Sequence, residues 1–113
     1  MEELICLGRA LRSVKDSYKT ILVDCLTLWM SNLFFEYPDQ DETISEIVDD
    51  FFLSIDKFEE TIIIVSNELG MGIVPENKLA RVYRDSLGFL NQRIAGRADE
   101  VYMLFSGIPV RIK

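Results

Sequence analysis

The sequence contains no histidine and only two cysteines among its 113 residues. Cys6 and Cys25 lack the close spacing of zinc ligands, which excludes the common structural zinc sites. We therefore expect two reduced, buried thiols. Because no imidazole is present, any chemistry that needs a histidine has to find it outside these residues.

Long apolar runs are also missing. The longest, Ile62–Val65 and Val101–Phe105, are far too short to cross a bilayer. Glu2 and Glu3 stand where a secretory signal would have basic residues. These absences predict a cytoplasmic protein with no membrane span.

Positive charge is scarce, because 12 Lys and Arg residues stand against 19 Asp and Glu residues, for a formal net charge of −7. A nucleic-acid-binding surface needs clustered Lys and Arg to replace counterions, so we expect no nucleic-acid partner. A nucleotide is still compatible with this charge, since one phosphate group needs only a few local donors. The length and the 49% hydrophobic composition are typical of one globular domain.

Apolar periodicity predicts four helices and four strands. The helices are expected at Glu2 to about Lys15, at Leu26–Glu36, from Thr43 onward and at Pro75 to about Arg97. The strands are expected at Thr20–Asp24, Thr61–Ser66, Val101–Phe105 and Val110–Ile112. Two start signals support the helix positions: Thr43 and Glu46 form a capping box, and Pro75 suits the first helical position.

This alternation of strands and helices predicts an α/β fold, with a parallel sheet and helices on both faces. Thr20–Asp24 is apolar except at its ends, as expected for a strand covered on both faces. Ligands in such sheets bind beyond the carboxyl ends of the strands. Asp24 and Asn67–Glu68 both follow predicted strands, so the pattern points to them as site residues.

The residue types leave alternatives open at each of these positions. Asp24 has the position of a Walker-B acid, which holds Mg²⁺ beside nucleotide phosphates, but an Asp after a strand also caps helices and forms turns. Asn67–Glu68 precedes Gly70-Met71-Gly72, which lets the backbone approach a ligand or forms a plain turn.

The arginines of the fourth predicted helix are a further candidate set. Arg81 and Arg84 lie three residues apart, and Arg93 and Arg97 lie four apart. Such pairs clamp phosphates, bridge subunits or form a solvated helix face, and the last is the most common arrangement.

Three stretches have a more specific pattern. They are residues 21–33 (ILVDCLTLWMSNL), 65–77 (VSNELGMGIVPEN) and 79–93 (LARVYRDSLGFLNQR). Together with the ending at residues 98–113, they resemble the bifunctional adenosylcobinamide kinase/adenosylcobinamide-phosphate guanylyltransferases. The resemblance covers the chain except for residues 36–60, which are generic.

The resemblance implies a RecA-like P-loop NTPase fold and two reactions of cobalamin biosynthesis. In the first, ATP or GTP phosphorylates the aminopropanol hydroxyl of adenosylcobinamide. In the second, GMP passes from GTP to adenosylcobinamide phosphate through a histidine that carries it transiently. The family is also associated with homo-oligomers, trimers in particular.

The resemblance singles out four positions of this chain. Asp24 matches the Walker-B acid and is the expected Mg²⁺ and nucleotide contact. Glu2, or its neighbour Glu3, resembles an acidic pair that contacts the guanine nucleotide. Asn67 and Glu68 match the family's S-N-E motif and are further candidate nucleotide-binding residues, without an assigned role.

Two family elements have no counterpart in the sequence. The phosphate-binding G-x-x-x-x-G-K-S/T loop is absent, and no histidine is available to accept GMP. We therefore expect residues 1–113 to be a single partial domain, truncated at the amino terminus and inactive alone. The alternative is a non-catalytic nucleotide- or corrinoid-binding or assembly module. Either way, exposed strand edges would make the isolated chain marginally stable unless it oligomerises or meets the missing part.

Overall fold

The structure is a computed structural model that describes residues 1–113. The chain forms two compact units, Met1–Asn67 and Glu68–Lys113. The first unit contains helix α1 (Leu7–Val14), strand β1 (Thr20–Asp24), helices α2 (Leu26–Glu36) and α3 (Asp41–Ile55), and strand β2 (Thr61–Val65). The second contains helix α4 (Lys78–Arg97) and strands β3 (Tyr102–Phe105) and β4 (Ile108–Arg111). No helix is both long and apolar enough to cross a membrane.

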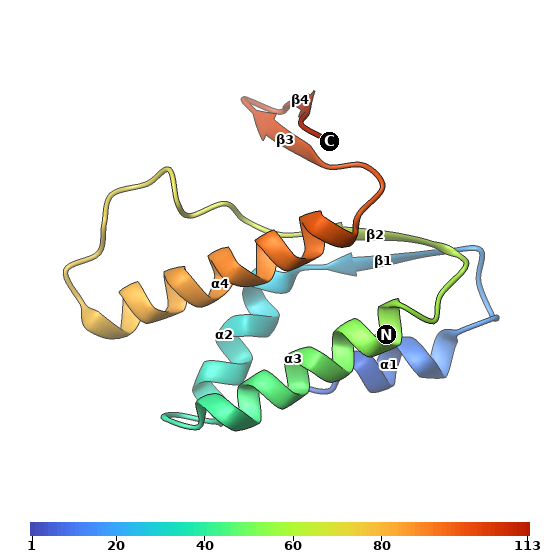
Figure 1. The fold of residues 1–113 in the computed structure, drawn as a ribbon, viewed down its shortest axis with the longest axis horizontal. Helices are drawn as coiled ribbons and strands as arrows, with labels where there is room; N and C mark the ends of the chain where they lie inside the picture. The colour runs from blue at the N-terminus through green and yellow to red at the C-terminus, as the bar shows by residue number, and fades with distance from the viewer. The chain divides into compact units, whose positions relative to one another are not determined.

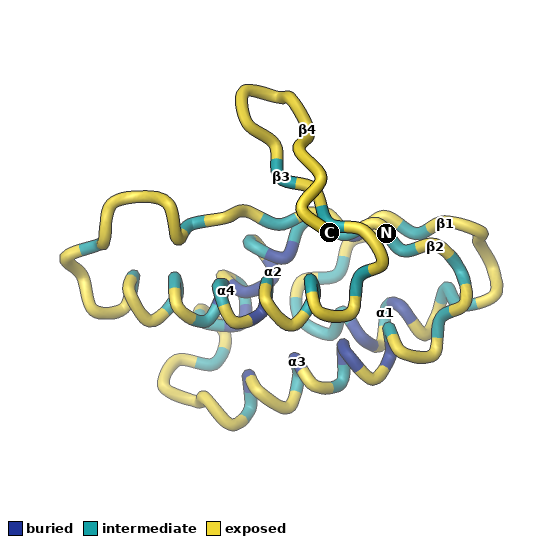
Figure 2. The backbone as a smooth tube through the Cα atoms, turned by 45° about the horizontal axis from the view of Figure 1, so that its top comes forward, coloured by how far each residue is buried: buried dark blue, intermediate teal, exposed yellow.

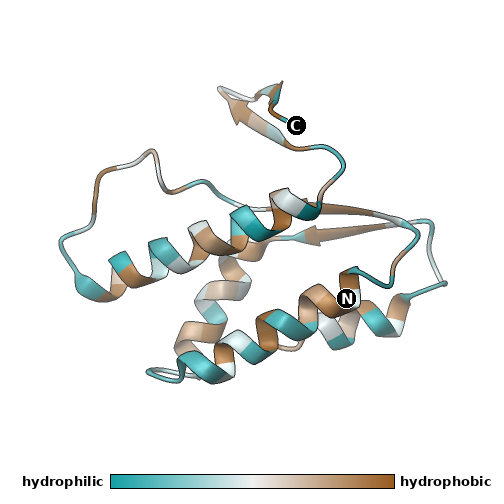
Figure 3. Ribbon diagram, viewed as in Figure 1, coloured by the Kyte–Doolittle hydropathy of each residue, from teal (hydrophilic) through white to brown (hydrophobic).

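The first unit is an α/β arrangement around one parallel strand pair. β1 and β2 pair in register from Thr20 opposite Thr61 to Asp24 opposite Val65 (Figure 1). The pairing is parallel, as predicted, and the two strands end together, which places Asp24 beside the end of β2. Both strands are hydrophobic apart from Thr20 and Asp24 at the ends of β1 and Thr61 at the start of β2 (Figure 3).

The strands are not covered on both faces, and this corrects the expectation for Thr20–Asp24. Val23 is buried, whereas Leu22 in β1 is 62% exposed, and Ile63 and Val65 in β2 are 50% and 41% exposed. Successive side chains of a strand point to opposite faces. The three exposed residues thus form an apolar face without cover, and the burial alternates along both strands.

An aromatic cluster holds α2 against α3. The ring of Trp29 lies 4.9 Å from that of Phe51, which lies 5.5 Å from that of Phe52, and all three residues are buried. Figure 2 shows buried stretches in both helices. Leu26 and Leu33 of α2 are fully buried. The two cysteines are free and half-buried, somewhat more open than expected.

Helices α1 and α3 lie side by side (Figure 1). Gly8 makes this close approach possible, because a Cβ at Gly8 would lie 3.0 Å from the backbone oxygen of Asp50. One turn further along α1, Arg12 Nη1 donates to Asp50 Oδ1 at 2.8 Å and to Ser54 Oγ at 2.6 Å. A glycine and an arginine thus fix the contact between the two helices.

The predicted start of the first helix is wrong. α1 begins at Leu7 rather than Glu2, because the Glu3 side chain folds back on the backbone ahead of the helix. Glu3 Oε1 accepts hydrogen bonds from the amides of Ile5, at 2.9 Å, and Cys6, at 2.8 Å. Residues before Leu7 therefore form a turn that a carboxylate organises.

Two other helix starts also differ from the prediction. α3 begins at Asp41, so Thr43 lies inside its first turn and the predicted capping box does not set the start of the helix. Instead, Asp41 and Glu42 place carboxylates near the positive end of the helix dipole. α4 begins at Lys78 rather than Pro75, because Asn77 is the N-cap and its Oδ1 accepts from the amides of Leu79 and Ala80.

The last two strands form a hairpin rather than an extension of the parallel sheet. β3 and β4 pair antiparallel in a two-stranded sheet of their own. Ser106 and Gly107 connect them with φ angles of 53° and 75°, the left-handed pair that a tight hairpin turn requires. This two-residue turn brings the start of β4 forward to Ile108 from the predicted Val110.

Candidate functional site

Asp24 occupies the carboxyl end of β1, directly before α2. Its carboxylate is exposed and makes no hydrogen bond or ion pair within the chain, and its peptide bond to Cys25 is cis. The N-cap of α2 is Cys25, with no side-chain cap, so Asp24 does not serve as the helix cap. Of the alternatives for Asp24, the geometry favours a carboxylate that is available to a ligand.

The segment before α1 is fastened beside Asp24 by two side chains of α2. Trp29 Nε1 donates to the carbonyl oxygen of Ile5 at 2.8 Å, and Asn32 Nδ2 donates to that of Leu4 at 3.3 Å. As a result Glu2, Glu3 and Asp24 line one cavity of about 460 Å³ between α1, β1 and α2. The structure therefore brings the predicted residues Glu2 and Asp24 together.

The two glutamates of this cavity differ in how they are engaged. The amides of Ile5 and Cys6 hold the pKa of Glu3 below its ordinary value, and Arg9, with Nη2 at 4.0 Å from Oε2, lowers it further. Glu3 is thus committed to the turn. Glu2 is exposed and makes no hydrogen bond or ion pair, which leaves it available together with Asp24.

Metal binding at this cavity would depend on the ligand as well as on the protein. No group of three or more His, Cys, Asp or Glu residues is arranged to hold a metal ion. Mg²⁺ in nucleotide sites is commonly bound through one or two carboxylates together with phosphate oxygens and waters. The free carboxylate of Asp24 fits that kind of site and does not fit an all-protein metal cage.

The S-N-E motif is divided between the two units. The amide of Asn67 donates to Thr27 Oγ1 at 3.0 Å, so Asn67 lies beside the start of α2, on the same edge as Asp24. Glu68 belongs to the second unit, where its Oε1 accepts from the amide of Gly70 at 2.6 Å.

The loop between Glu68 and α4 is held in shape by two arginines. Arg84 Nη2 donates to the carbonyl oxygen of Gly70 at 2.8 Å. Arg81 Nη1 donates to that of Pro75 at 2.9 Å and also to that of Glu76. These contacts fasten the loop to its own helix, a role that the alternatives considered for the pair did not include. The spacing of three residues was the only signal for it in the sequence.

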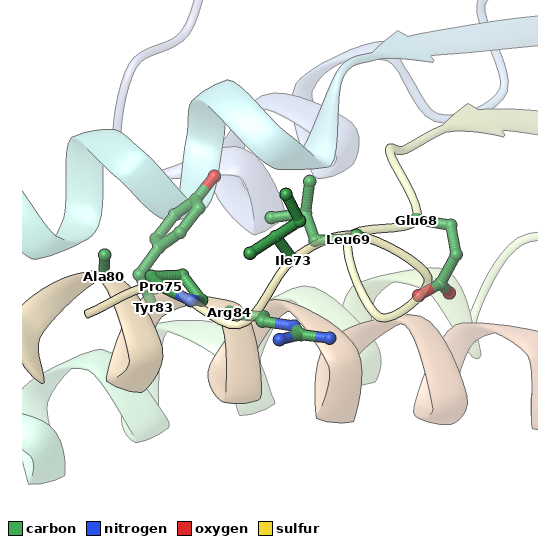
Figure 4. A pocket seen from close by; sticks show the side chains of 8 residues that line it. Glu68, Leu69, Ile73, Pro75, Ala80, Tyr83 and Arg84 are labelled. Carbon is green, nitrogen blue, oxygen red and sulfur yellow. The ribbon is translucent and has the colours of Figure 1, made fainter. Parts of the chain in front are cut away.

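This loop encloses a second cavity of about 350 Å³, which sequence reasoning did not find (Figure 4). Figure 4 shows Leu69 and Ile73 between the rings of Tyr83 and Pro75 and the charged groups of Glu68 and Arg84. The cavity is apolar, with one carboxylate and one guanidinium at its rim.

The fold is that of an α/β protein with a parallel strand pair, and its candidate site, a free carboxylate beside a cavity, lies at the strand ends, where proteins of this class usually bind nucleotides and cofactors. The profile of one family, described as cobinamide kinase / cobinamide phosphate guanyltransferase and abbreviated CobU, matches residues 1–112. The chain belongs to this family.

Named relatives agree with the family match. The bifunctional adenosylcobalamin biosynthesis protein CobU of Salmonella typhimurium is 38% identical over 104 residues, covering 82% of this chain and 58% of the relative. The protein of the same name from Escherichia coli is 36% identical, covering 84% and 59%. The bifunctional adenosylcobalamin biosynthesis protein CobP of Pseudomonas aeruginosa is 36% identical, covering 100% and 64%. The chain thus spans about three fifths of the length of these relatives.

Proposed function

We propose that this chain forms part of an enzyme of cobalamin biosynthesis that phosphorylates adenosylcobinamide with ATP or GTP and then transfers GMP from GTP to adenosylcobinamide phosphate. The family match over residues 1–112 carries the proposal. The cavity that joins Glu2 to Asp24 supports a nucleotide site within this chain. A P-loop fold, a cytoplasmic location and a homo-oligomer, a trimer in particular, belong to the same proposal.

Asp24 would hold Mg²⁺, which when bound neutralises the phosphate charge during transfer. In the kinase step the aminopropanol oxygen attacks the γ-phosphorus, the bond to the β-phosphate oxygen breaks, and the hydroxyl proton is released. Glu2 would contact the guanine nucleotide at the rim of the same cavity, where Trp29 and Asn32 fix its segment.

In the second reaction a histidine attacks the α-phosphorus of GTP and releases pyrophosphate. A phosphate oxygen of the corrinoid then attacks the same phosphorus and frees the histidine. This chain has neither a histidine nor a G-x-x-x-x-G-K-S/T loop, so other residues must supply both. We therefore expect the 113 residues alone to be inactive.

The first experiment tests complementation. The purified chain is incubated with α-labelled GTP and Mg²⁺, alone and with a separately expressed amino-terminal segment of a relative that carries the loop and the histidine. Covalent label that appears only in the mixture is the expected result. A chain that stays folded by circular dichroism yet yields no label in either sample would contradict the enzyme proposal and support the alternative, a binding or assembly module, which the lack of histidine favours.

The second experiment tests the two free carboxylates. Asp24→Asn and Glu2→Gln should each reduce labelling in the mixture by about tenfold or more, the usual size of an effect from losing one charged contact. Glu46→Gln is the matched control, because Glu46 is an exposed carboxylate on α3 that does not line the cavity. Equal labelling by Asp24→Asn and Glu46→Gln would remove Asp24 from the site.

A further inference from the structure

We infer that the cavity under the 68–75 loop binds the edge of the corrinoid substrate, with a side-chain amide of the corrin held between Glu68 and Arg84. This inference rests on the proposed function and assigns a place to its second substrate. It concerns a cavity that lies wholly within the second unit and shares no residue with the cavity of Asp24 and Glu2.

The charge at the rim selects the chemistry of the ligand. One carboxylate and one guanidinium give no net charge, so a triphosphate would meet a single cation and a repelling anion. A neutral primary amide fits better, because its NH₂ donates to a carboxylate while its carbonyl oxygen accepts from a guanidinium. Cobinamide carries such amides around a methylated, largely apolar ring.

Both charged groups have capacity left for a ligand. Glu68 accepts the Gly70 amide through Oε1, and its Oε2 makes no hydrogen bond within the chain. Arg84 donates from Nη2 to the carbonyl oxygen of Gly70. Because a guanidinium has five N–H donors, Arg84 has donors left for a ligand. The same contacts that shape the loop thus hold the two groups in place before a ligand arrives.

The apolar part of the cavity matches the remainder of a corrin edge. About 350 Å³ lies at the small end of the range for ligand sites, enough for one amide arm and the adjoining ring edge but not for the whole macrocycle. Ile73, which lines the cavity, is 96% exposed. Such an open apolar side chain on a fastened loop is suited to cover a large ligand that stays partly outside.

The test measures binding of dicyanocobinamide to the whole chain by equilibrium dialysis, read from the visible absorbance of the corrin. Ile73→Ser should raise Kd at least fivefold and Glu68→Gln at least threefold. Val74→Ser is the matched control and should change Kd less than twofold, because Val74 is also exposed and apolar but does not line the cavity. All these side chains are exposed, so the variants should fold, as circular dichroism would confirm.

Three results would overturn the inference. One is a folded chain that binds no dicyanocobinamide; another is binding that Ile73→Ser and Val74→Ser alter equally. In the third, Ile73→Ser weakens the binding of a fluorescent GTP analogue but not the binding of the corrinoid, which would show that the cavity binds the nucleotide. The GTP-labelling experiment tests the proposed function independently. The assignment of the corrinoid to the cavity under the 68–75 loop can therefore be wrong while the proposed function is correct.

Discussion

Substitution of Gly8 by alanine should destabilise the chain, although alanine is the better helix former. A Cβ at this position would lie 2.4 Å from Asp50 Oδ2 and 3.0 Å from both Asp50 O and Ser54 Oγ. The carboxylate can swing away, but it then loses its 2.8 Å bond to Arg12. The backbone oxygen cannot swing, so α1 and α3 have to separate.

The sizes of the opposing free-energy contributions decide whether Gly8→Ala stabilises or destabilises the chain. Alanine gains about 1 kcal/mol over glycine in a helix interior, which is an upper limit for Gly8 because it is the second residue of α1. Overpacking costs roughly 1–3 kcal/mol, and a half-exposed ion pair such as Arg12–Asp50 contributes about 0.2–1 kcal/mol. The balance for Gly8→Ala is a loss of about 0.2–3 kcal/mol, with a central value of about 1.5 kcal/mol.

Urea unfolding, followed by the fluorescence of the single tryptophan, Trp29, measures this change in the first unit. At typical m values the midpoint should fall by about 1 M. Gly88→Ala is the control, because a Cβ at Gly88, in the middle of α4, meets no atom within 4 Å. It should stabilise α4 by about 0.5–1 kcal/mol, read by circular dichroism. If Gly8→Ala is as stable as the parent, the close contact of α1 with α3 is not as described.

Substitutions at three further positions test local contacts of the fold. Because the pKa of Glu3 is lowered in the folded chain, its carboxylate stabilises the fold above the ordinary pKa of 4.5, and this stabilisation is lost as the pH falls through the lower folded pKa. Urea unfolding of Glu3→Gln should therefore show a lower free energy of unfolding than the parent at pH 7 and the same free energy in acid. A difference in stability that does not depend on pH would contradict the role of the charge. Asn77→Ala should cost about 1 kcal/mol by loss of the α4 cap, whereas Asn77→Asp, measured in the same way by circular dichroism, should retain most of it. Trp29→Phe keeps a ring against Phe51 but removes the donor to Ile5, so hydrogen exchange of residues 1–6 should accelerate; unchanged exchange would show that this bond does not hold the segment.

The parts of the fold that sequence predicted well are those that short-range patterns determine. β1 and α2 begin and end where the apolar pattern places them, and the carboxyl end of β1 delivers Asp24 to the edge of the sheet. The three wrong helix starts share one cause. Thr43 and Pro75 are common start signals, but the structure uses the carboxylate of Glu3, the acidic first turn at Asp41 and the amide of Asn77. Several residues near each start can satisfy its free amides, and the sequence does not rank them.

The candidate site depended on contacts over longer distances in the chain. That Glu2 shares a cavity with Asp24 follows from hydrogen bonds of Trp29 and Asn32 to backbone oxygens 24 and 28 residues away. No periodicity encodes such pairs. Both strands of the last hairpin were predicted, but the start of β4 was placed two residues too late, since the turn uses left-handed Ser106 beside Gly107, and serine is an uncommon residue there.

The manner in which Arg81 and Arg84 hold the 68–75 loop bears on how that loop tolerates change. Both arginines bind main-chain oxygens, which every residue type possesses, so the frame of the loop is indifferent to the side chains at positions 71, 73 and 74. A library randomised at these three positions would vary the outward chemistry of the loop while its path stays fixed. The loop is thus a natural starting point for engineering altered ligand selectivity, with the two arginines as the residues to leave untouched.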